Sequence, residues 1–137
     1  MLEFNFKHGE DDYVLGEENF TYIDNEEIED FGLEEVIQIL NEATEKVDFD
    51  YEYFVGQCEE CGGGKAVDKK HYGFLEYHFY IFTKDGKYVM SNISKEFEET
   101  SFTKLVKEKK VDNSYIVSVL FCEDCKTYNI AIEQCDM

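Results

Sequence analysis

Four cysteines in two close pairs are the residues of this chain with the clearest chemical meaning. Cys58 and Cys61 enclose two acidic residues, and so do Cys122 and Cys125, which gives two C-x-x-C motifs. Two thiolates on one tight loop can point at one ion, and two such loops complete the tetrahedral four-sulfur site that suits Zn²⁺. The sequence therefore predicts a structural zinc site with Cys58, Cys61, Cys122 and Cys125 as its ligands.

The same cysteines leave two other kinds of chemistry open. A four-sulfur site also binds iron, which would make the chain a rubredoxin-like electron-transfer protein. C-x-x-C pairs without metal occur in thiol redox proteins, but the acidic residues inside both pairs disfavour the reactive thiolate that this chemistry needs. Sixty residues separate Cys61 from Cys122. The segment between them must then be an insertion between two metal-binding knuckles, which loop-closure entropy permits.

The other reactive side chains form no comparable pattern. His71 and His78 have opposite parity in one predicted strand, so they fall on different faces of it. His8 lies in a predicted turn, and we expect all three histidines to have structural roles. Cys135 is interpreted as a spare thiol. The sequence contains no nucleophile elbow, P-loop, H-E-x-x-H or dinucleotide motif, so we name no catalytic residue and expect a protein that is not an enzyme.

The charge of the chain is strongly acidic and unevenly spread. Its 137 residues include 32 Asp and Glu against 13 Lys, for a net charge of −19. Residues 1–57 hold 18 acidic residues and 2 Lys, whereas residues 58–137 hold 14 and 11. Such a field repels nucleic acid and anionic lipid and favours a basic protein partner. No apolar run has membrane-spanning length and no signal peptide is evident, so the expected location is the cytoplasm.

Hydrophobic periodicity indicates the elements that must position the cysteines. Apolar residues at helical spacing predict one main amphipathic helix over 33–47, with Asp30 as its N-cap, and a short helix over 101–110 capped by Ser101 or Thr100. The Asp85-Gly86 turn predicts a hairpin after a densely aromatic strand, because Asp-Gly favours positive φ. Alternating patterns predict strands within 2–23 and over 49–55, 65–68, 72–83, 115–121 and 126–132.

These elements predict a single α+β domain over residues 1–137, with a mostly antiparallel sheet covered by the main helix. We expect an acidic α/β part over about residues 1–48. A part with a zinc-ribbon-like two-knuckle metal site, containing the inserted hairpin and the short helix, is expected over about residues 49–137. In this arrangement the metal fastens two hairpins that are far apart in the sequence.

The repeated order of strand, C-x-x-C, turn and strand is similar to the zinc-ribbon group of folds. This resemblance covers the four cysteines, the Gly62-Gly63-Gly64 turn and the flanking strands, and Lys126 stands where a glycine often follows the second pair. The whole chain also resembles a family of uncharacterised small acidic proteins of Firmicutes, chiefly clostridia, classed as a domain of unknown function. That resemblance implies no activity. From the four cysteines and the acidic charge, we expect a zinc-binding module whose acidic N-terminal surface binds a basic protein.

Overall fold

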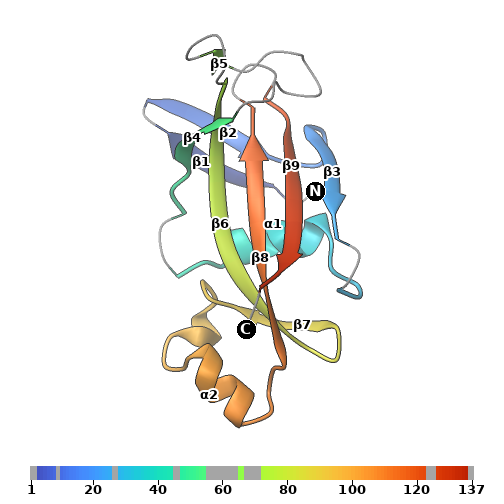
Figure 1. Cartoon of the computed structure of the whole chain (residues 1–137). Helices are drawn as coiled ribbons and strands as arrows, with labels where there is room; N and C mark the ends of the chain where they lie inside the picture. The colour runs from blue at the N-terminus through green and yellow to red at the C-terminus, as the bar shows by residue number, and fades with distance from the viewer. Residues whose placement is uncertain are drawn as a thin grey trace.

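The computed structural model describes residues 3–8, 10–25, 28–44, 47–54, 65–66, 72–122 and 126–135. Within these ranges, nine strands greatly outnumber two short α-helices and one 3₁₀ helix (Figure 1). The strands are β1 (Phe4–His8), β2 (Asp11–Leu15), β3 (Phe20–Asp24), β4 (Asp50–Phe54), β5 (Lys65–Ala66), β6 (Tyr72–Lys84), β7 (Lys87–Ser91), β8 (Asn113–Phe121) and β9 (Tyr128–Gln134). The helices are α1 (Leu33–Asn41), η1 (Lys95–Phe97) and α2 (Phe102–Lys107). None of these described helices is long and apolar enough to cross a membrane.

One curled sheet of seven strands forms the body of the protein. Its main order is β3-β9-β8-β6-β4, and β5 and β7 pair with opposite ends of the long strand β6. The β3–β9 pair is parallel and the other pairs are antiparallel, so the sheet is mixed. Strands β1 and β2 form a separate antiparallel hairpin.

The predicted fold class, α+β with a zinc-ribbon-like two-knuckle metal site, is wrong. The described residues form a β-rich fold around a mixed sheet, and among them no group of three or more His, Cys, Asp or Glu side chains is placed to hold a metal ion. The physical reason lies in β6, β8 and β9, which are seven to thirteen residues long and rich in aromatic and β-branched residues. Such runs build long, twisted strands instead of the short hairpins of a ribbon.

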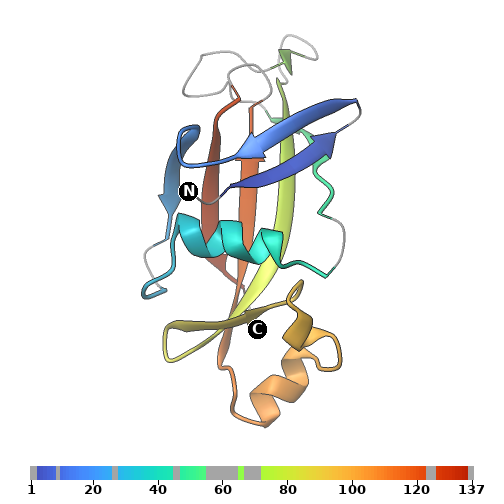
Figure 2. The same cartoon turned by 180° about the vertical axis from the view of Figure 1, so that it is seen from behind.

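The hydrophobic core lies between this sheet and a layer made of α1 and the β1–β2 hairpin (Figure 2). Val36 and Leu40 of α1 and Val117 of β8 are buried there at 2% exposure or less. Phe6 of β1 stacks on Phe49, with ring centroids 4.0 Å apart, and meets Phe121 edge-on at 5.5 Å. Residues from both predicted parts, 1–48 and 49–137, therefore share one core.

Helix α1 is shorter than the predicted span of 33–47 and is not capped by Asp30. Asp30 has a φ of 51°, whereas an N-cap residue needs an extended backbone, and Gly32 takes that position without a side-chain cap. After the helix ends at Asn41, the Thr44 backbone N–H donates to the Ile93 carbonyl at 3.0 Å, which leads the chain away from the helix axis. A long-range hydrogen bond thus overrides the helical periodicity of the sequence.

Two local predictions are confirmed. Asp85 and Gly86 have φ values of 52° and 80°, as the predicted hairpin between β6 and β7 requires. Ser101 caps α2, because its Oγ accepts from the Lys104 backbone N–H at 3.2 Å. This helix ends at Lys107, three residues before the predicted end at residue 110. Both features depend on chemistry within a few residues, which is why the sequence predicts them.

Phe79→Ala tests the assignment of the core. Phe79 has no exposed surface in β6, so truncation removes buried apolar area and leaves a cavity. We expect the free energy of unfolding, measured by urea titration, to fall by about 3–5 kcal/mol. Val89→Ala, at a β7 side chain that is 39% exposed, should change it by less than about 0.5 kcal/mol. Equal losses in the two variants would contradict the assignment.

Candidate functional site

The described residues include only one of the four predicted metal ligands. Cys122 follows the last residue of β8 and is buried, with 3% of its surface exposed. Cys58 and Cys61, between β4 and β5, and Cys125 lie outside the described residues. Cys135, the predicted spare thiol, follows β9 and is partly exposed. The candidate site is therefore built from Cys122 and from the strand ends that flank the two pairs.

The strands that lead into the two cysteine pairs end at the same end of the sheet (Figure 1). β4 and β8 pair antiparallel with opposite sides of β6, so they run in the same direction. The last residue of β4, Phe54, is opposite Tyr72, and the last residue of β8, Phe121, is opposite Leu75. The offset is three residues, or about 10 Å along β6, and two strand spacings add about 10 Å across it. Strand ends more than sixty positions apart in sequence are thus neighbours.

Strand β5, which follows the first cysteine pair, lies still closer to Cys122. Gly73 of β6 pairs with β4 on one side, so its second partner, Lys65 of β5, lies on the side that β8 occupies. Gly73 is two residues beyond Leu75, the partner of Phe121. Strand β5 therefore continues the line of β8 just past its end, and Lys65 is four residues after Cys61.

The described ends of the second cysteine loop form a tight turn. The Lys126 backbone N–H donates to the Cys122 carbonyl at 2.8 Å, and the Cys122 N–H donates to the Thr127 carbonyl at 2.9 Å. Lys126 has a φ of 59°, in the left-handed region that favours glycine. The lysine thus adopts the conformation that a glycine would provide after a metal-binding C-x-x-C pair.

Two side chains fasten the base of this loop to the N-terminal part of the chain. Asn19 Nδ2 donates to the carbonyls of Lys126 and Val14, at 2.9 and 2.8 Å, while its Oδ1 accepts from the Gly16 backbone N–H at 2.9 Å. The Tyr128 hydroxyl donates to the Gly16 carbonyl at 2.7 Å. The turn that precedes β3 and the turn that precedes β9 are therefore held together at the same end of the sheet.

The electrostatics of Tyr128 reinforce this fastening. Its ring is 1% exposed. Burial, with a smaller contribution from the Glu17 carboxylate, raises the pKa of Tyr128 far above the usual value of about 10. The hydroxyl is therefore a permanent hydrogen-bond donor over the whole range of ordinary pH.

The three histidines occupy unrelated places. His8 is the last residue of β1 and not part of the predicted turn. His71 lies outside the described residues. His78 lies on β6 with its side chain exposed on the face of the sheet opposite α1.

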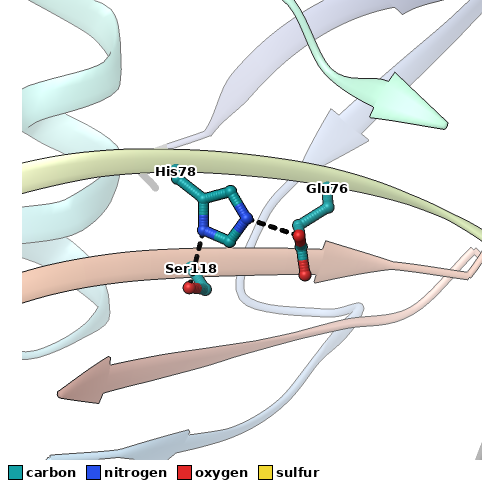
Figure 3. Close-up of polar contacts among 3 residues, drawn as sticks. All are labelled: Glu76, His78 and Ser118. Carbon is teal, nitrogen blue, oxygen red and sulfur yellow. Dashed lines mark hydrogen bonds and ion pairs between the residues drawn. The ribbon is translucent and has the colours of Figure 1, made fainter. Parts of the chain in front are cut away.

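Sequence reasoning missed a polar cluster around His78. Its Nδ1 lies 2.8 Å from Ser118 Oγ, and its Nε2 contacts Glu76 Oε1 (Figure 3). Glu76 and His78 are two residues apart on β6 and share a face, and Ser118 of β8 is directly opposite His78. The Glu-x-His spacing was a visible signal in the sequence, but the serine is identified only by the register between β6 and β8.

The cluster contains the groups of an acid–base relay without a site for a developing oxyanion. Strand β8 pairs with β6 on one side and β9 on the other, so the backbone N–H groups around Ser118 donate within the sheet. A tetrahedral intermediate on Ser118 would find no backbone donor among these groups. The two contacts instead fix the three side chains on this surface of the sheet.

The fold and the candidate site define a β-rich protein with two C-x-x-C pairs, whose flanking strand ends meet at one end of a mixed sheet. The chain belongs to the family described as Protein of unknown function (DUF3785), whose sequence pattern matches residues 4–137. No curated protein and no solved structure matches it. The predicted resemblance to a domain of unknown function is thereby confirmed, whereas the match does not bear on an origin in Firmicutes or on a zinc ribbon.

Lys126→Gly should stabilise the protein. The left-handed conformation costs a non-glycine residue about 1–2 kcal/mol, and glycine removes this cost. Part of that gain is cancelled, because glycine loses more backbone entropy on folding than lysine does. We expect the free energy of unfolding to rise by about 0.5–1 kcal/mol in urea titrations. The same change at Lys107, in the last turn of α2, should lower it by about 1 kcal/mol. A loss at both positions would contradict the strained turn.

Tyr128→Phe tests the buried hydroxyl through alkaline stability. Above pH 10 the unfolded state loses the tyrosine proton while the folded state retains it, so wild-type stability falls by about 1.4 kcal/mol per pH unit from this group. The variant lacks this fall. It should be less stable than wild type by about 1 kcal/mol at pH 8, and the gap should close as pH rises from 10 to 11. Tyr80→Phe, at a ring 43% exposed, is the control, and a pH-independent gap for Tyr128→Phe would refute the assignment.

Proposed function

We propose that this protein binds one structural zinc ion through Cys58, Cys61, Cys122 and Cys125. The observation that carries the proposal is that the last residues of β4 and β8, and the whole of β5, pair with the first residues of β6. Zinc–sulfur bonds are about 2.3 Å long, so the two loops of a four-cysteine site must start from neighbouring strand ends. The flanking strands of both pairs meet that requirement.

The local structure of the second pair supports the same proposal. Cys122 is withdrawn from solvent at the end of β8, and the turn that follows closes through Lys126 in the left-handed conformation. Metal coordination gives buried thiolates the compensating charge that they need away from water. The acidic residues inside both pairs disfavour the reactive thiolate that redox chemistry needs, so zinc is favoured over dithiol chemistry.

In this proposal the zinc is a clamp on a β-rich sheet. Four thiolates fill its tetrahedral coordination and leave no position for substrate, so its role is structural. It joins the loop between β4 and β5 to the loop between β8 and β9. A cross-link between points so far apart in sequence removes many conformations of the unfolded chain, and metal binding thereby adds to folding stability.

We further propose that the clamped sheet is a binding module for a basic protein. The net charge of −19 supports this proposal, because it attracts cationic partners over several ångströms and repels nucleic acid and anionic lipid. Association with such a partner should weaken as the salt concentration rises.

Elemental analysis of the full chain, purified without chelator, tests the zinc site. We expect one zinc per chain in the wild type and no visible absorption. Cys122→Ser should lose the zinc, whereas Cys135→Ser, at a cysteine outside the proposed ligand set, should keep it. Because Cys122 is buried, Cys125→Ser serves as a second variant that removes a ligand.

Thiol counting on the same samples distinguishes the alternatives. In the zinc protein, Cys135 should react rapidly with an alkylating reagent, and the other four thiols should react only after chelation. One iron per chain with visible charge-transfer bands would overturn the structural zinc site and indicate an iron site for electron transfer. A metal-free protein whose five thiols all react without chelator would overturn the metal site and favour thiol redox chemistry.

A further inference from the structure

One face of the sheet carries no described helix or strand (Figure 1), whereas α1 and the β1–β2 hairpin cover the other (Figure 2). We call the uncovered surface the open face. It consists of every second residue of β6 from Glu76 to Tyr80, of β8 from Ile116 to Leu120 and of β9 from Asn129 to Glu133. All nine side chains are partly or fully exposed.

The open face has an apolar character that a solvated sheet surface does not need. A sheet with one wet face normally alternates apolar residues inside with polar residues outside. Here Tyr80 is 43% exposed and lies directly opposite Ile116, and Leu120 and Ala131 are half-buried nearby. Tyr22 of β3 is 46% exposed and points away from the core that its neighbour Ile23 joins. These two tyrosines are the most exposed large apolar side chains of the described residues.

Carboxylates lie beside these apolar side chains. Glu76 and Glu133 lie on the open face itself. Asp50 of β4 is opposite Glu76, and Asp24 of β3 is opposite Ala131, so these two exposed residues flank it at both edges. None of the described positions in these rows is a lysine. The surface is therefore complementary to apolar side chains that are accompanied by cations.

The polar cluster at the centre holds this surface in shape. His78 contacts Glu76 along β6 and Ser118 across to β8, so each of the three side chains has a fixed partner (Figure 3). A surface whose side chains are already ordered loses less entropy when a partner docks. The cluster therefore favours binding without taking part in chemistry.

We propose that the open face is the docking surface for the basic protein, and that it takes a segment presenting apolar side chains flanked by Lys or Arg. This inference rests on the proposed binding function and moves the contact away from the acidic N-terminal surface. Exposed charge pairs alone contribute little to affinity. Aromatic and aliphatic anchors beside charged groups contribute much more, and the open face carries both.

A fluorescent peptide of alternating Lys and Leu residues is the probe, titrated with the full chain at low salt and read by anisotropy. Asp24→Lys combined with Glu133→Lys reverses two charges of the open face and its edge. Glu10→Lys combined with Asp11→Lys makes the same change of net charge at exposed positions near the turn of the β1–β2 hairpin. We expect the first pair to weaken binding at least about tenfold and the second less than about threefold.

A second pair of variants tests the apolar anchors. Tyr80→Ser combined with Ile116→Ser should weaken binding at least about tenfold, and Val14→Ser combined with Val89→Ser, also at exposed sites, should leave it nearly unchanged. A peptide of alternating Lys and Ser should bind the wild type more weakly than the Lys-Leu peptide.

The outcomes separate this inference from the binding function on which it rests. Equal weakening by the two charge-reversal pairs would show that binding depends on net charge alone. This result would overturn the open face as the docking surface, but it would still be consistent with a basic protein partner. Failure of the Lys-Leu peptide to bind at low salt would overturn both. Far-UV circular dichroism and urea unfolding of every variant show that it is folded, so lost binding is not lost structure.

Discussion

Strand β6 is the constraint on which the other elements depend. Its 13 residues pair with β8 along one side and with β4 and β7 along the other, and β5 completes its first end. Because a backbone hydrogen-bond ladder fixes both direction and register, β6 decides which segments of the chain become neighbours. The approach of the strand ends that flank the two cysteine pairs, the position of Ser118 opposite His78 and the order of the open face all follow from this one strand.

The alternation along β6 and β8 also divides the sheet into a buried face and an exposed face. Phe79 and Val117 point to the core beneath α1, while His78, Tyr80 and Ser118 point to the open face. A shift of one residue in register would exchange the two sets, so burial of the apolar set keeps the exposed set in place. The stability of the core and the chemistry of the surface are therefore two consequences of the same pairing.

The sequence predicts features whose causes are local. The Asp85-Gly86 turn and the Ser101 cap depend on residues within one turn of the chain, and the alternating runs locate most of the strands. The end of α1, the parallel pairing of β3 with β9 and the position of Ser118 opposite His78 depend on contacts between distant segments, and no local pattern encodes them. The zinc-ribbon fold class failed for the same reason, because a C-x-x-C motif describes a loop and not the sheet around it.

The parallel pair β3–β9 has a consequence for how the chain acquires its structure. Phe20 is opposite Tyr128, and the Thr21 hydroxyl donates to the Tyr128 carbonyl, so one edge of the sheet joins residues about a hundred positions apart. Contacts of such long range close late and slow folding. On the ribosome, β3 has no partner until β9 has left the exit tunnel. The edge that β3 forms is therefore the last part of this sheet to be completed.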